Sequence, residues 1–123
     1  MISLVVKPDD DGTERYGQKV SALQSNIQIK GTAISGTLNK VSSYTGFDSH
    51  ETEGHYLALK FETDADKLTS KIIGGSGNVV DLTKDKYCVY KITGTSQKIE
   101  LQATKSKQTT TKTYTLEGLQ LSE

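Results

Sequence analysis

The sequence predicts an all-β protein, an antiparallel β-sandwich of about seven strands, on three observations. From residue 26 onward, apolar and polar residues alternate with the period of two that is typical of half-buried strands. Turn-forming clusters of Gly, Asp, Ser and Thr recur about every ten residues, which is the spacing of sandwiches and barrels. Hydrophobic residues make up only 33% of the 123 residues, a share that suits sheets with one face in water.

The first 25 residues differ from the rest of the chain. "ISLVV" is a strand candidate, and the polar, turn-rich stretch "KPDDDGTERYGQKVSALQS" follows it. We therefore divide the chain into an N-terminal arm or hairpin at residues 1–25, which is a candidate docking segment, and a β-sandwich domain at residues 26–123.

Four segments of the second part show the alternation most clearly. The apolar residues that share a strand face are Ile27 and Ile29; Leu57, Leu59 and Phe61; Ile99, Leu101 and Ala103; Tyr114 and Leu116. The best helical candidate, residues 65–72, is short and has no capping residue. It is equally well explained as a turn that leads into a strand.

The charge pattern argues against a nucleic-acid partner. The chain has 15 basic and 15 acidic residues, and every basic one except Arg15 is a lysine. Nucleic-acid recognition favours a basic excess and the planar fork of arginine, so we interpret the basic stretch at residues 105–112 as a solvated strand flank.

No apolar stretch approaches transmembrane length, and the N-terminus lacks the basic region of a secretory signal. We expect no membrane partner and synthesis in the cytoplasm.

The single cysteine and two turn-like motifs do not predict an active centre. Cys88 has no partner for an internal disulfide and stands among β-formers in "KYCVYKI", so we expect a buried structural thiol. "DDDGTE" (9–14) lacks the alternating acidic ligands of a calcium loop, and "GGSGN" (74–78) lacks the Gly-Lys-Ser/Thr ending of a phosphate loop. We interpret both as turns and expect no cofactor, no metal and no catalytic residues.

"FDSHETEGHY" (47–56) is the densest group of chemically active side chains. The residues that a small metallohydrolase would use are His50, Glu51, Glu53 and His55. The two histidines are five residues apart, which sets them roughly 140° apart on a helix, and Gly54 disfavours a helix. We therefore interpret the segment as a solvated loop that enters a strand near Tyr56, and keep the metal site as a minor alternative.

Three aromatic residues, Tyr44, Phe47 and Tyr56, form the candidate ligand or partner surface. Aromatic faces can stack on sugar rings, so a carbohydrate-binding module that mediates surface adhesion is one functional hypothesis. The other interpretation is that Tyr44 and Phe47 close one end of the core while the tyrosine hydroxyl reaches water. The absence of tryptophan favours this second interpretation.

Most of the chain resembles a small β-domain of head-fibre and capsid-decoration proteins in tailed phages of Gram-positive bacteria. The matching stretches are "ISGTLNKVSSYTGF" (34–47), "GHYLALKF" (54–61), "KYCVYKIT" (86–93), "QKIELQATK" (97–105) and "TKTYTLEGLQL" (111–121). With the connecting turns they cover residues 26–121, in a specific order and spacing that contains no catalytic motif. The histidines after "YTGF" and the segment before residue 26 depart from the family pattern.

This resemblance implies an Ig-like β-sandwich with a non-enzymatic, structural role on the capsid surface of a virion, as a decoration or a head fibre. The implied partner is the major capsid protein, with host-surface or mucosal glycans as a second class of partner. Symmetric capsid positions favour a homo-oligomer such as a trimer, because many modest contacts add up. Synthesis would take place in the cytoplasm of the bacterial host.

Overall fold

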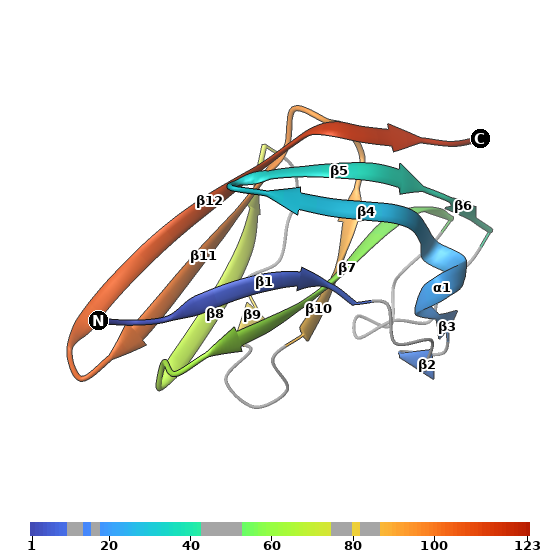
Figure 1. The fold of residues 1–123 in the computed structure, drawn as a ribbon. Coiled ribbons are helices and arrows are strands. Elements are labelled where there is room, and N and C mark those ends of the chain that lie inside the picture. The colour runs from blue at the N-terminus through green and yellow to red at the C-terminus, as the bar shows by residue number, and fades with distance from the viewer. Residues whose placement is uncertain (10–13, 16–17, 43–52, 75–79, 82–86) are drawn as a thin grey trace.

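The computed structural model describes residues 1–9, 14–15, 18–42, 53–74, 80–81 and 87–123. Their two large sheets pack face to face, which confirms the predicted all-β sandwich (Figure 1), and two short strands form a third, two-stranded sheet. The turns "DDDGTE" and "GGSGN" lie mostly outside these residues, as do Tyr44, Phe47, His50 and Glu51. No helix in the described ranges is long and apolar enough to span a membrane.

One sheet is four-stranded and is built around its longest strand, β7. β1 pairs antiparallel with one edge of β7 and β10 with the other, while the short β6 continues the β1 side. The strand bounds are β1 Leu4–Pro8, β6 Lys40–Val41, β7 Gly54–Thr63 and β10 Tyr87–Ile92.

The other sheet is six-stranded, in the order β4-β5-β12-β11-β8-β9. The bounds are β4 Gln24–Lys30, β5 Ala33–Leu38, β8 Lys67–Ile73, β9 Val80–Asp81, β11 Lys98–Lys105 and β12 Gln108–Leu121. Its pairs are antiparallel except for β5 with β12, which run parallel. Parallel neighbours need a long crossover, and here strands β6 to β11, which alternate between the two sheets, separate β5 from β12 along the chain.

The expected N-terminal arm contributes a strand to the sandwich. In β1, Leu4 pairs with Thr63 and Pro8 with Leu59, and the side chains of Leu4 and Val6 are buried in the core. The chain then passes through β2 Glu14–Arg15, β3 Gln18–Lys19 and the four-residue helix α1 Val20–Leu23. β4 starts at Gln24, close to the predicted boundary after residue 25. A docking role for residues 1–25 stays a prediction.

Residues 65–72, the best helical candidate of the sequence, are mostly strand β8. Leu68, Ser70 and Ile72 point into the sandwich because the period-two pattern, and not a helical one, places the two apolar side chains on one face. A turn that leads into a strand is therefore the correct one of the two interpretations.

The core lies between the sheets, and a smaller cluster lies outside the four-stranded sheet. The buried residues of the main core include Leu4, Val6, Ile34, Leu38, Leu57, Leu59, Phe61, Leu68, Ile99, Leu101, Tyr114 and Leu116. The smaller cluster joins Leu23 of α1 to Tyr56, Ala58 and Val89. Strand β7 is thus buried on both faces between residues 56 and 59, although its alternation alone resembles that of a half-buried strand.

The side chain of Gln24 fills a break in the pairing of β7. Val89 of β10 stands opposite Ala58 on one edge of β7, but on the other edge, between the parts that pair with β1 and with β6, Ala58 has no strand residue opposite it. The Ala58 N–H donates to Oε1 of Gln24 over 2.8 Å, and Nε2 of Gln24 donates to the Ala58 carbonyl over 3.1 Å. Asp9 N–H donates to the same carbonyl. The side-chain amide of Gln24 therefore replaces the backbone of a neighbouring strand as hydrogen-bond partner of the buried residue Ala58.

Replacing Gln24 with Ala should lower the free energy of unfolding by about 2 kcal/mol, because the buried N–H of Ala58 loses its partner. Urea unfolding measures this difference. Gln28→Ala, on the exposed part of the same strand, is the matched control and should change stability by less than about 0.5 kcal/mol. Equal losses in the two variants would contradict the role assigned to the Gln24 amide.

Close backbone contact between β12 and β5 requires a glycine. The register of this parallel pair shifts between Thr115 and Gly118, and a Cβ on Gly118 would lie 2.7 Å from Cβ of Ser35. Such a contact is far inside van der Waals distance, so a larger residue would push the two strands apart.

Gly118→Ala should therefore destabilise the protein by about 1–3 kcal/mol. The control is Gly94→Ala, since a Cβ on Gly94 meets nothing within 4 Å. Thermal unfolding of both variants checks the expectation: the melting temperature should fall for Gly118→Ala and stay near that of the parent for Gly94→Ala. A Gly118→Ala variant as stable as the parent would show that the strands separate at no cost.

Candidate functional site

The described part of the predicted aromatic surface is buried. Tyr56 is only 1% exposed and packs with Leu23, Ala58 and Val89 outside the four-stranded sheet. Its ring face is therefore not available to a sugar in this structure. The other two members of the predicted surface, Tyr44 and Phe47, lie outside the described residues.

The described half of "FDSHETEGHY" makes structural contacts. Glu53 Oε1 lies 3.1 Å from Nζ of Lys40 on β6, and this hydrogen bond and charge raise the pKa of Lys40. His55 Nε2–H donates to the carbonyl oxygen of Ser122, near the C-terminus. A nitrogen that donates a proton cannot ligate a metal ion at the same time. Glu53 and His55 thus tie β6, β7 and the C-terminal segment together.

A metal site is not assembled within the described part of the chain. No three side chains of His, Cys, Asp or Glu gather there closely enough to hold an ion. Of the four residues that the metal alternative would use, His50 and Glu51 lie outside the described ranges. The remaining two are engaged as just described.

Cys88 is buried, as the sequence predicts. The side chain is 2% exposed in the core, and burial raises the pKa of its thiol to about 12. Two residues further along the same face of β10, the Tyr90 hydroxyl lies 2.6 Å from Oγ of Ser70 on the opposite sheet. Burial also raises the pKa of Tyr90 well above its usual value. The thiol stays protonated at neutral pH and so is a poor nucleophile.

The carboxylate of Asp64 is engaged in hydrogen bonds and an ion pair within the protein. Asp64, in the turn between β7 and β8, accepts hydrogen bonds from the backbone and the hydroxyl of Ser3, and it pairs with Lys105 Nζ over 2.8 Å. The hydrogen bond from Lys105 holds the pKa of Asp64 well below its usual range. Asp64 therefore joins the start of β1 to the end of β11.

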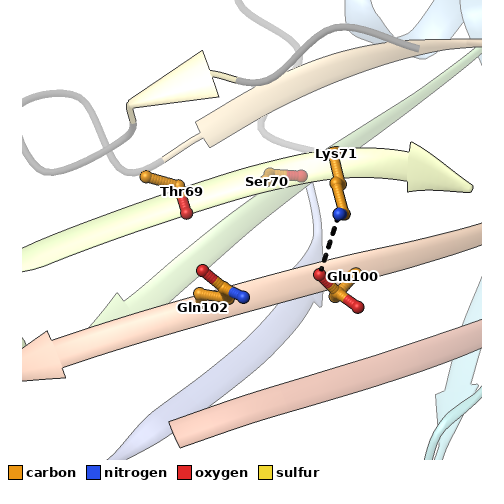
Figure 2. Close-up of a pocket in the computed structure, with 5 residues that line it drawn as sticks. All are labelled: Thr69, Ser70, Lys71, Glu100 and Gln102. Atoms are coloured by element: carbon orange, nitrogen blue, oxygen red, sulfur yellow. Dashed lines mark ion pairs between the residues drawn. The ribbon is translucent and has the colours of Figure 1, made fainter. Parts of the chain in front are cut away.

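A shallow pocket lined by polar residues on the six-stranded sheet was not predicted from the sequence. It has a volume of about 150 Å³ and lies over β8 and β11, as Figure 2 shows. Its lining residues are Thr69, Ser70, Lys71, Glu100 and Gln102. The Lys71 ammonium and the Glu100 carboxylate lie 3.5 Å apart. The pocket therefore offers an ammonium, a carboxylate, an amide and a hydroxyl within a small area.

The alternation of apolar and polar residues predicts part of the pocket lining. It places Glu100 and Gln102 opposite Ile99 and Leu101, and so on the outer face of a strand. It could not show that β8 lies beside β11, since strand order is not written in alternation.

Taken together, the fold and these sites define a β-sandwich module with one wide polar sheet face. Comparison of the chain with family models, curated proteins and solved structures finds no match in any of the three.

The buried thiol leads to a pH dependence of stability. In the unfolded chain Cys88 ionises near pH 9, whereas in the folded chain its pKa is about 12. The folded state thus holds a proton that the unfolded state releases, so the free energy of unfolding should fall above pH 9, by up to about 1.4 kcal/mol per pH unit for this proton. Urea unfolding from pH 8 to 11 should show a smaller slope for Cys88→Ala than for the parent. Identical slopes would contradict this origin.

Proposed function

We propose that this chain is a non-enzymatic structural protein of a tailed-phage virion, which decorates the capsid or forms a fibre on the head. One observation carries the proposal. The stretches that resemble the phage head domain coincide with the strands that build the core: "GHYLALKF" lies in β7, "KYCVYKIT" covers β10, "QKIELQATK" covers β11 and "TKTYTLEGLQL" lies in β12. The resemblance therefore extends over several core strands and not over one short motif, while strand β1 lies outside it.

The Ig-like classification and the capsid position belong to the same proposal. A decoration protein has to be stable by itself and to present a large solvated surface to its surroundings. The described residues meet both needs, because the core is continuous between the sheets and the outer face of the six-stranded sheet is polar. Binding to the assembled shell would stabilise that shell by mass action, and repeated copies at symmetric positions would add modest contacts to a large sum.

An adhesive function that depends on aromatic stacking is the weaker hypothesis. Its described member, Tyr56, is buried.

An N-terminal docking role also needs a careful test, since deleting residues 1–25 would remove both strand β1 and the side chain of Gln24. Attachment should therefore be measured with the full chain.

Co-sedimentation with phage particles tests the proposal. The tagged full-length protein is mixed with particles from a culture of the host strain and centrifuged through a density gradient at low and at high salt. We expect a band that travels with intact heads and is competed by the untagged protein, because specific capsid positions are limited in number. Protein that stays at the top of the gradient at both salt concentrations would overturn the proposal.

A further inference from the structure

Twelve side chains form a regular grid on the outer face of β8, β11 and β12. The registers of these strands align them in four rows across the sheet. The rows are Ile73, Lys98 and Thr115; Lys71, Glu100 and Thr113; Thr69, Gln102 and Thr111; Lys67, Thr104 and Thr109. We call these residues the outer grid. With ordinary strand spacings it is about 10 Å wide and about 20 Å long.

The outer grid is rich in threonine and lysine. Threonine occupies half of its positions, and all four positions on β12 are threonine. Its charged residues are three lysines and a single glutamate, although the whole chain has a formal net charge of zero. The described helix, α1, packs on the other sheet and leaves these side chains exposed or half-buried. The face is therefore positive and rich in hydroxyl groups.

The threonine side chains of the grid have little conformational freedom before any ligand arrives. Threonine is β-branched and stiff at χ1, so ordering it on binding costs little entropy. At one end of the grid, the hydroxyls of Thr104 and Thr109 lie 3.2 Å apart and hydrogen-bond each other. The strands beneath are fixed by the core, because Ile99, Leu101 and Tyr114 on their inner faces are buried.

The chemistry of the grid matches an extended, acidic glycan. Each threonine hydroxyl can donate and accept, as sugar hydroxyls do, and Gln102 adds an amide with both capacities. Lysines along two of the three strands provide ammonium groups for carboxylate, sulfate or phosphate substituents. Four of the five residues that line the pocket of Figure 2 belong to the grid, and at this pocket a sugar ring can approach both Lys71 and Glu100.

We propose that the outer grid of β8, β11 and β12 binds an extended polysaccharide chain that carries acidic groups. The chain lies along the strands, with its hydroxyls on the threonine row of β12 and its acidic groups on the lysines of β8 and β11. This inference does not depend on the virion function, and it places the glycan on another face than the aromatic hypothesis does. Charge complementarity selects acidic over neutral glycans.

Binding is tested with the purified full-length protein on a printed panel of neutral and uronate-bearing oligosaccharides, followed by calorimetry with alginate oligomers and with uncharged dextran. We expect binding to the uronates that weakens as salt is added, and none to dextran. The absence of binding to every glycan on the panel overturns the proposal, and so does equal binding to dextran. Neither result bears on co-sedimentation with phage heads.

Two sets of variants locate the site. Thr111→Val with Thr113→Val removes two hydroxyls but keeps β-branched side chains, and it should weaken binding about tenfold while the melting temperature stays unchanged. Lys71→Gln should weaken binding and reduce its salt dependence. The matched control is Lys7→Gln, since Lys7 forms a cross-strand ion pair with Glu62 over 2.7 Å on the other sheet. If Lys7→Gln weakens binding as much as Lys71→Gln does, or the threonine variant binds like the parent, the grid is not the site.

Discussion

The fold depends on one strand, β7, which needs packing partners on both faces and hydrogen-bond partners on both edges. Between residues 56 and 59 both faces of β7 are buried; β10 pairs along one edge, and β1 and β6 pair along parts of the other. A strand in such a place cannot leave a backbone group unpaired without a penalty comparable to a lost hydrogen bond. The break between β1 and β6 is the point where this requirement is hardest to meet, and the side chain of Gln24 meets it.

A second buried glutamine, Gln97, has a similar task between β10 and β11. Where the chain leaves β10 for β11, and so passes from one sheet to the other, Gln97 is 4% exposed. Its Oε1 accepts hydrogen bonds from the N–H groups of Thr93 and Gly94, over 2.7 and 3.1 Å. Gln24 also stands where the chain enters the six-stranded sheet. At both of these places the pairing between strands stops, and a buried glutamine amide supplies the hydrogen-bond partner that a neighbouring strand no longer provides.

These contacts show what the sequence could and could not predict. Alternation correctly assigned Leu57, Leu59 and Ile99 to the core, since inward-facing residues of a sandwich have to be apolar. The same rule places a glutamine in water, so the burial of Gln24 and Gln97 could not be inferred from residue type. The second buried face of β7 depends on α1, four residues that carry no period of their own. The parallel pairing of β5 with β12, and the outer grid, depend on strand order, which a local pattern does not contain.

The packing of the core sets the spacing of the outer grid, because alternate residues of the same strands form the two. Along β12, Thr113 and Thr115 point outward while Tyr114 and Leu116 are buried, so the spacing of the hydroxyls is set by the packing beneath them. The alternation ends where the register with β5 shifts before Gly118, because the glycine has to approach Ser35 closely. Before that shift, the outward position that follows Thr115 is the exposed Glu117, so the threonine row ends at Thr115 because of the residue type. A ligand of the grid would meet a row of four threonines whose spacing is set by the packing of the core beneath them.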